Sequence, residues 1–278
     1  MERKRLTITL RKDLLPQVDE IIDGAKIRNR SHAIEYLLLQ SLRPRLSRAF
    51  ILAGGEGIKM RPFTYEMPKS MLPVHNRPIL EYIIDLLRNN EIREIIILVG
   101  HLGEKIKNHF GDGTKFGVKI SYLEEKKAEG TAKPLLKIKK FVRNQPFLVI
   151  YGDILAEINL QEFFDFHQGH GNLASVALSS VAEPSSYGVV KLRGDKILGF
   201  EEKPKKNQKL SRLVSAGIYI LNPKVINYVP NKAYSMLEED VLPQLARESQ
   251  LFGWPFEGQW FDVGTPEIYE RVLKEWKK

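Results

Sequence analysis

Residues 49–74, AFILAGGEGIKMRPFTYEMPKSMLPV, combine a glycine-rich turn with three cations that could bind phosphate. An apolar run typical of a buried strand ends at the turn 54–57, and Lys59, Arg61 and Lys69 follow it. Glycines let main-chain amides approach an anion, and the cations would neutralise its charge. The glycine spacing fits neither the dinucleotide-binding nor the Walker pattern. A tight turn needs glycine with or without a ligand, so the loop alone leaves both interpretations open.

The elements that must position this loop alternate between strand and helix. The apolar runs 49–55, 94–100, 118–125 and 147–155 predict strands, and 78–90, 103–110 and 131–141 predict helices between them. Repeated strand–helix–strand units with wholly apolar strands indicate an α/β fold, with a Rossmann-like, mostly parallel sheet covered on both faces. In such folds ligands bind at the carboxyl ends of the strands. The loop 54–57 lies at such an end.

Composition limits the class of protein. The 278 residues are 43% hydrophobic, and no apolar run is long enough to span a bilayer. The first residues, MERKRLTITL, carry charge without the apolar core of a signal peptide. We therefore expect a cytoplasmic protein without membrane contact. Because the chain has no cysteine, disulfides and thiolate metal sites are excluded, and any metal must be held by oxygen or histidine.

The positive charge is concentrated near the N-terminus. The formal net charge is +9, and residues 1–48 contribute 11 Lys and Arg against 6 Asp and Glu, hence 11 − 6 = +5. A basic N-terminal part favours a polyanionic partner, although solvated lysine-rich surfaces are common.

Residues 1–44 predict a small unit with a different periodicity. Residues 5–10 alternate polar and apolar side chains, as a half-buried strand does, with Leu6, Ile8 and Leu10 on the apolar face. Asp13 is expected to cap a first helix, and Ser31 a second one whose apolar residues are Ala33, Ile34, Leu37 and Leu38. One strand and two short helices cannot bury this surface alone, so the unit is expected to pair with a second copy.

This unit closely resembles the ribbon-helix-helix DNA-binding family over about residues 3–42, including the stretch NRSHAIEYLL. The resemblance implies a two-stranded ribbon that enters the major groove of double-stranded DNA. Arg5, Thr7 and Thr9 would then contact bases, and Ser31 would lie at a phosphate. The alternative is a unit that only joins chains into a homodimer or higher oligomer, because threonines are ordinary strand residues.

The second part of the chain resembles the sugar-1-phosphate nucleotidyltransferase family, whose first motif has the form LAGG-x-GTRL-x-P-x-T-x-x-x-PK-x-x-LPV. LAGGEGIKMRPFTYEMPKSMLPV matches it in register. Further matches follow in order: EGTA at 129–132, YGDIL at 151–155, YGVV at 187–190, EEKP at 201–204, SAGIYIL at 215–221, EEDVLPQL at 238–245 and WFDVGT at 260–265. The resemblance covers residues 49–278 and predicts two domains, 1–44 and 45–278.

Such enzymes join a sugar 1-phosphate to a nucleoside triphosphate and release pyrophosphate, so they are also called nucleotide-sugar pyrophosphorylases. The phosphate oxygen attacks the α-phosphorus in line, and catalysis depends on positioning and charge neutralisation. The resemblance implies nucleotide binding by Leu52, Ala53, Gly54, Gly55, Gly57 and Gly130. It implies that Asp153 and Asp262 hold Mg²⁺ and that Lys69 meets phosphates. It places Gly188 and Glu202 at the sugar hydroxyls and Lys203 at the sugar phosphate.

Three positions depart from the family pattern. Its Thr-Arg pair is Ile58-Lys59 here, and the glycine usual after GTA is Lys133. The family arginine binds the departing pyrophosphate through a planar fork, whereas lysine is a flexible point charge. Lys59 is thus a catalytic residue of reduced strength by this comparison. Arg61 or Lys133 could compensate in part, although Arg61 could equally be a solvated loop residue.

Two hypotheses follow from these matches and departures. The first is an active nucleotidyltransferase whose N-terminal unit assembles the oligomer and binds DNA. The second is a transcriptional regulator that uses a degenerate nucleotidyltransferase domain to sense a nucleotide or nucleotide sugar. Both aspartates, Lys69 and the Glu202-Lys203 pair are retained, and a sensor would not need both metal ligands, which favours the enzyme. The base and the sugar stay open, with residues 121–135 closer to guanylyl- and uridylyl-type relatives than to thymidylyl ones.

Overall fold

The computed structural model describes residues 6–42, 45–125, 127–142, 144–205 and 211–277. The chain divides into two compact units, Met1–Arg45 and Leu46–Lys278. Each unit is described by itself. Within the described ranges, no helix is both long and apolar enough to cross a bilayer.

The N-terminal unit contains two α-helices, α1 (Leu15–Glu20) and α2 (Arg30–Leu42), and a 3₁₀ turn at Lys12–Leu14. Val18 and Ala33 are buried between them, and Arg30 donates two hydrogen bonds to the Asp19 carboxylate at 2.7 and 2.8 Å. Residues 6–10 form no strand within the single chain. The ribbon needs a second chain, so it stays a prediction.

The structure corrects both predicted helix caps. Asp13 does not cap the first helix, because α1 begins only after Leu14 and its first turn carries Pro16; Asp13 pairs instead with Arg11 at 3.0 Å. Ser31 does not cap α2, because Asn29 lies one residue before the helix and its side chain accepts the backbone N–H of His32 at 3.0 Å. An asparagine in that position satisfies a free helix amide as well as a serine does.

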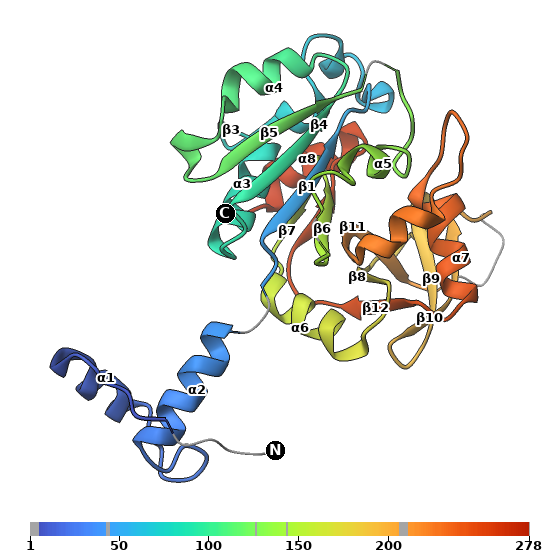
Figure 1. Ribbon diagram of the computed structural model, residues 1–278. Helices are drawn as coiled ribbons and strands as arrows, with labels where there is room; N and C mark the ends of the chain where they lie inside the picture. The colour runs from blue at the N-terminus through green and yellow to red at the C-terminus, as the bar shows by residue number, and fades with distance from the viewer. Residues whose placement is uncertain (1–5, 43–44, 126, 143, 206–210, 278) are drawn as a thin grey trace. The chain divides into compact units, whose positions relative to one another are not determined.

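The second unit is built on a sheet that, among the described residues, has nine strands in the order β5-β4-β1-β6-β11-β8-β12-β10-β9. The strands are β1 (Arg48–Ala53), β4 (Glu94–Val99), β5 (Lys119–Glu124), β6 (Phe147–Tyr151), β8 (Ala174–Ser180), β9 (Gly188–Arg193), β10 (Lys196–Glu202), β11 (Leu213–Leu221) and β12 (Leu251–Pro255). Figure 1 shows the sheet crossing the unit with helices on both sides.

The sheet is α/β as expected but mixed rather than mostly parallel. Strands β5, β4, β1 and β6 are parallel neighbours, whereas β11 runs antiparallel to β6 and β8, and β10 runs antiparallel to β9 and β12. The reason is local: the two-residue connection between β9 and β10 makes a hairpin, which can join only antiparallel strands. The helix-crossover pattern of residues 49–155 does not extend through the rest of the chain.

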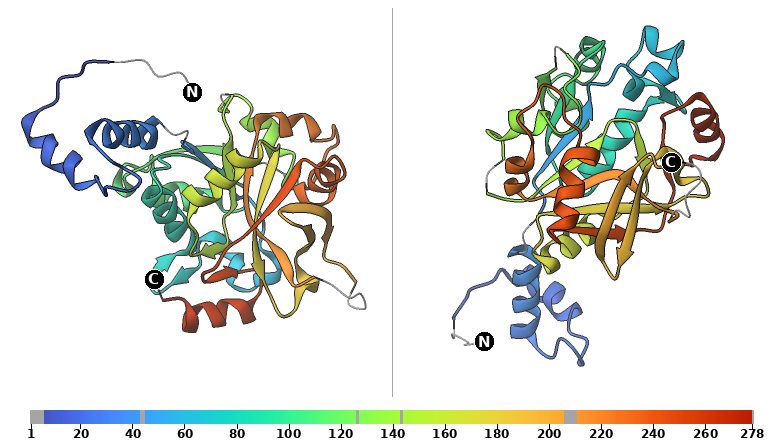
Figure 2. Two further views of the ribbon diagram at one scale, coloured as in Figure 1. Left: turned by 90° about the horizontal axis from the view of Figure 1, so that it is seen from below. Right: turned by 90° about the vertical axis from the view of Figure 1, so that its right-hand side faces the viewer.

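Helices cover both faces of this sheet (Figure 2). The helices are α3 (Ile79–Asn89), α4 (Gly103–Phe110), α5 (Pro134–Ile138), α6 (Leu160–His170), α7 (Leu242–Arg247) and α8 (Pro266–Glu275). Successive strand residues point to opposite faces, so Ala49 and Ile51 pack with α3, α4, α6 and α8, while Phe50 packs with α5 and α7. The two apolar cores fix the strand ends at which the glycine loop lies.

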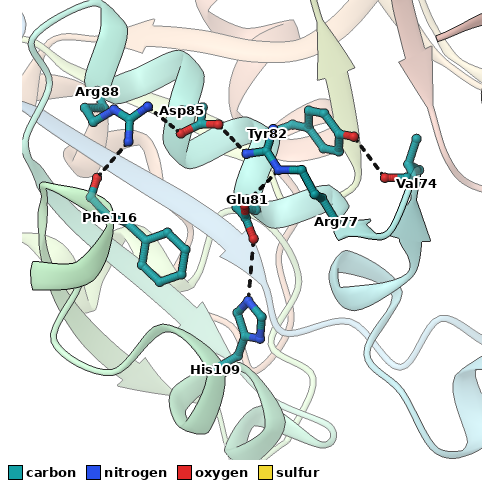
Figure 3. A network of polar contacts seen from close by, with 8 residues as sticks. All are labelled: Val74, Arg77, Glu81, Tyr82, Asp85, Arg88, His109 and Phe116. Carbon is teal, nitrogen blue, oxygen red and sulfur yellow. Dashed lines mark hydrogen bonds and ion pairs between the residues drawn. The ribbon is translucent and has the colours of Figure 1, made fainter. Parts of the chain in front are cut away.

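A polar network anchors α3 to the hairpin of β2 (Pro73–Val74) and β3 (Arg77–Pro78), as Figure 3 shows. Arg77 pairs with Glu81 at 2.7 Å and with Asp85, and its guanidinium lies 4.6 Å from the centre of the Tyr82 ring. The Tyr82 hydroxyl donates to the Val74 carbonyl oxygen at 2.9 Å. These contacts hold the segment that leads from Lys69 into the helix layer.

A second small sheet pairs β7 (Ile154–Ala156) with β13 (Trp260–Asp262) in antiparallel register. Strand β7 directly follows β6 and the turn at Gly152 and Asp153. Ile154 is opposite Asp262, and the Val263 amide donates to the Asp153 carbonyl oxygen at 3.0 Å. This pairing brings the two predicted metal ligands side by side.

Candidate active site

A cleft of three adjoining lobes lies at the carboxyl ends of β1, β4, β5 and β6. The glycine lobe is lined by the residues Leu52, Ala53, Gly54, Gly55, Leu98, Glu125, Gly130, Tyr151 and Tyr234, among others. The lysine lobe is lined by Gly57, Lys59, Lys69, Asp153, Lys203 and Asp262. The polar lobe is lined by Gly188, Glu202, Lys203, Ser215, Tyr219 and Glu238. Asp153 and Lys69 are shared by the first two lobes, and Asp262 and Lys203 by the last two.

The glycine lobe has a backbone floor. Gly130 adopts φ +85°, and a Cβ there would lie 2.2 Å from the Ser235 carbonyl oxygen. The Ser235 amide donates to Glu129 and its carbonyl oxygen accepts from Ala132, at 3.0 and 2.9 Å. Only glycine fits between these two chain segments. Five of the six predicted nucleotide-binding residues line this lobe, and the sixth, Gly57, lines the lysine lobe.

The lysine lobe collects opposite charges in a partly buried space. Lys69 forms an ion pair with the Asp153 carboxylate. Burial opposes a charge on Lys69, but Asp153 and Asp262 outweigh it and raise its pKa, so the ammonium group keeps its proton. Burial and the neighbouring Asp153 raise the pKa of Asp262, while Lys69, Lys203 and Lys59 oppose this shift. The two carboxylates therefore repel one another across a gap that cations line.

The polar lobe places hydrogen-bonding side chains on β9, β10 and β11. Lys203 has φ 46° and pairs with Glu202 at 2.7 Å. Glu202 is opposite Gly188 in the β9–β10 register, and a Cβ at Gly188 would lie 2.9 Å from a Glu202 carboxylate oxygen. The structure thus brings the three residues predicted for the sugar into one wall.

Sequence analysis missed Glu238, which lies at the back of the polar lobe and is only 5% exposed. Its carboxylate accepts hydrogen bonds from the hydroxyls of Thr131 at 2.7 Å and Tyr219 at 3.2 Å. Burial raises the pKa of Glu238 to about 7, although the Thr131 hydroxyl opposes this. The motif EEDVLPQL contained this residue, but burial could not be seen beside two further acidic residues.

Two hydroxyl groups in the cleft lack partners among the described residues. Ser70 Oγ and the Tyr151 hydroxyl are both buried and make no hydrogen bond there. Both residues line the glycine lobe, and Tyr151 also lines the polar lobe. A buried polar atom without a partner is costly, and a bound ligand could provide one.

The three departures from the family pattern have different surroundings. Lys59 lines the lysine lobe, so a cation is present where the family has arginine. Lys133 does not line any of the three lobes; its Nζ donates to the Lys232 carbonyl oxygen at 2.5 Å. Arg61 also lies outside their linings, 3.8 Å from Glu56 and over the Tyr65 ring. The proposed compensation by Arg61 or Lys133 has no structural support.

Comparison with known proteins agrees with this geometry. The nucleotidyl transferase family model matches residues 48–278, so the chain belongs to this family. The chain is 35% identical over 246 residues to a UTP–glucose-1-phosphate uridylyltransferase of Synechocystis and 34% identical over 228 residues to a mannose-1-phosphate guanyltransferase of Saccharomyces cerevisiae. These matches cover 82% and 80% of this chain and 62% of each relative. The chain thus spans less than two thirds of the length of these curated relatives.

A solved structure has the same fold. It is a proposed glucose-1-phosphate thymidylyltransferase from Bacillus anthracis in complex with sucrose. It is 30% identical in sequence, superposes with a TM-score of 0.75, and is matched over 82% of this chain and 94% of its own.

Proposed function

We propose that the protein is a sugar-1-phosphate nucleotidyltransferase, which joins a nucleoside triphosphate to a sugar 1-phosphate and releases pyrophosphate. The observation that carries the proposal is the meeting of Asp153, Asp262 and three lysines at the junction of an apolar lobe and a polar lobe. A triphosphate needs cations at such a junction, with the base on one side and the sugar on the other.

In this proposal each lobe has one task. The glycine lobe holds base and ribose, and the unpartnered hydroxyls of Ser70 and Tyr151 offer hydrogen bonds to them. The polar lobe holds the sugar, with Glu202 accepting from its hydroxyls. Lys203 orients the sugar phosphate, whose oxygen attacks the α-phosphorus.

The bond between the α-phosphorus and the bridging oxygen to the β-phosphorus breaks as the new bond forms, and pyrophosphate leaves. Negative charge moves onto the departing group during this step. Lys59 and Lys69 lie where they can stabilise that charge, and both ammonium groups remain within the lysine lobe. No proton transfer is needed, since both phosphates act as anions.

A divalent cation fits the donor set of the lysine lobe. Asp153 and Asp262 offer hard carboxylate oxygens, and the raised pKa of Asp262 reflects burial and repulsion that a dication would relieve. We propose that these two residues hold Mg²⁺. When bound, the ion would neutralise phosphate charge and keep other positions for phosphate oxygens and water.

A pyrophosphate-release assay tests the proposed activity. The protein is incubated with Mg²⁺, one of the common nucleoside triphosphates and a hexose 1-phosphate, and the nucleotide sugar is identified by mass spectrometry. We expect product with at least one pair. Binding of a nucleotide without any pyrophosphate release would favour the sensor hypothesis instead.

We further propose that residues 1–44 pair with a second copy and bind DNA. Leu6 and Ile8 are 79% and 53% exposed, and Leu38 and Leu39 on α2 are also exposed, which leaves the unit with apolar surface that a partner chain would bury. Thr7 and Thr9 are exposed as well, while Arg5 lies outside the described residues. This arrangement suits a ribbon whose outer face is free for a DNA groove.

A further inference from the structure

The end of β5 carries a carboxylate fixed in place beside the glycine loop. The Glu125 amide donates to the Val99 carbonyl oxygen at 2.8 Å, which continues the β4–β5 pairing by one residue. The Glu125 side chain turns back, and its Oε1 accepts the Glu129 amide at 2.7 Å. Both the backbone and one carboxylate oxygen are therefore held.

The other oxygen of Glu125 faces the glycine lobe. A Cβ placed on Gly54 would lie 2.6 Å from Glu125 Oε2, so this oxygen lies directly against the Gly54 backbone. Among the described residues, none donates a hydrogen bond to Oε2. Burial raises the pKa of Glu125, although the Glu129 amide opposes this. The carboxylate thus has fewer donors than it would have in water.

The walls around Glu125 suit a nucleobase. Leu52 and Leu98 offer apolar surface on β1 and β4, and Tyr234 adds an aromatic ring. Such side chains pack on the faces of any base, so they do not select one. Selection must come from a group that contacts the base edge, and Glu125 is the carboxylate held at this end of the lobe.

A carboxylate only accepts hydrogen bonds, so it selects a base by its donors. Guanine has two adjacent N–H donors on one edge, at N1 and the 2-amino group. Uracil and thymine have one N–H between two carbonyl oxygens, and adenine and cytosine have an amino group beside a ring nitrogen lone pair. Each of these four brings an acceptor against the carboxylate, which is unfavourable.

We infer that Glu125 makes guanine the base for which the glycine lobe is selective, through hydrogen bonds from its N1–H and 2-amino groups. The inference rests on the proposed function for the place of the nucleotide, but it concerns binding and not turnover. Glu125 is a specificity-determining residue in this view, supported by the amides of Glu129 and Glu125 that orient it.

Equilibrium binding of nucleoside triphosphates to the full chain tests the inference, by calorimetry with Mg²⁺. We expect GTP to bind at least about tenfold more tightly than UTP, ATP or CTP, since one well-placed pair of hydrogen bonds discriminates by ~1–3 kcal/mol. ITP, which lacks the 2-amino group, should bind more weakly than GTP. This comparison needs no variant.

The substitution Glu125→Gln should reverse the preference. An amide offers one donor and one acceptor, which suits uracil better than guanine. We expect GTP affinity to fall at least about tenfold and the ratio of GTP to UTP affinity to fall with it. Glu124→Gln, the neighbouring carboxylate that pairs with Lys107, is the control and should leave the ratio unchanged.

Two outcomes overturn the inference: equal binding of GTP, ITP and UTP by the wild type, or an unchanged order in Glu125→Gln. Failure of the proposed function is distinct. A protein that prefers GTP without releasing pyrophosphate retains this inference and loses the catalytic proposal, whereas pyrophosphate release with UTP alone does the opposite.

Discussion

Asp262 on β13 is paired with Ile154 on β7, which places its carboxylate beside Asp153, the residue before Ile154. The two acids come from motifs far apart in the sequence, and an antiparallel pairing of two short strands joins them. Burial and the charge of Asp153 both raise the pKa of Asp262, so the pair is costly unless cations are present. A site that gathers such charge without a stabilising role elsewhere in the fold is typical of function.

The replacement of arginine by Lys59 predicts a measurable weakness. Lys59→Arg should keep or raise kcat, because a guanidinium can contact pyrophosphate oxygens with two parallel hydrogen bonds. Lys59→Ala should lower kcat by about tenfold or more, because the charge on the departing group is then less stabilised. Steady-state rates of pyrophosphate release give both values. Lys133→Ala is the control, since Lys133 does not line the lobes; a loss as large as that of Lys59→Ala would contradict the assignment.

Glu238 predicts a dependence of stability on pH. Its pKa is raised from 4.5 to about 7 in the folded protein, so between these values the folded state binds more protons than the unfolded state. Its contribution to the free energy of unfolding is therefore present below pH 4.5 and is lost as the pH rises to about 7, by up to ~3 kcal/mol. Urea denaturation across this range should show a smaller decline for Glu238→Gln than for the wild type.

Glu257→Gln controls for a general loss of acidic charge, because Glu257 is exposed after β12. Equal pH slopes for the wild type, Glu238→Gln and Glu257→Gln would show that Glu238 titrates normally.

The exposed apolar face of the N-terminal unit predicts self-association. Leu6→Glu with Ile8→Glu should shift the protein from dimer to a smaller species in size-exclusion chromatography with light scattering, because two charges cannot be buried at a ribbon interface. Lys12→Glu is a matched control with a single exposed charge change. A monomeric wild type, or a double variant that remains a dimer, would contradict the prediction.

The ribbon prediction also has a DNA test. Wild-type protein should bind duplex containing its own promoter, with an affinity that falls steeply as salt rises, and Arg5→Ala together with Thr7→Ala should weaken this binding. A gel-shift titration at several salt concentrations measures both effects. If the wild type fails to bind even at low salt, the unit only joins chains.

Local pattern explains much of the fold. The apolar runs that became β1, β4, β5 and β6 predicted a parallel sheet, because long apolar strands between helices have few other solutions. Strands β9 to β12 were not foreseen as an antiparallel half, since a hairpin such as β9–β10 depends on a turn whose partner strand is not visible locally. The sheet order of the second half is a property of tertiary contacts.

The site was predictable where motifs match and not where burial decides. Lys69, Asp153 and Asp262 were named from their motifs and lie together. Glu238 lies within a run of acids whose exposure the sequence does not reveal, and its role depends on Thr131 and Tyr219 from other segments. Asn29 and Ser31 are both good helix caps, and only the start of α2 decided between them.

The metal and phosphate chemistry assigned to Asp153 is tested by Mg²⁺-dependent pyrophosphate release from the wild type, Asp153→Asn and the control Glu257→Gln. Asp153→Asn keeps the shape of the side chain and removes its charge. We predict release by the wild type and Glu257→Gln, and at least about a hundredfold lower kcat for Asp153→Asn with nucleotide binding still detectable. Release by Asp153→Asn at the wild-type rate, or none by the wild type with any nucleotide and sugar 1-phosphate, would contradict it.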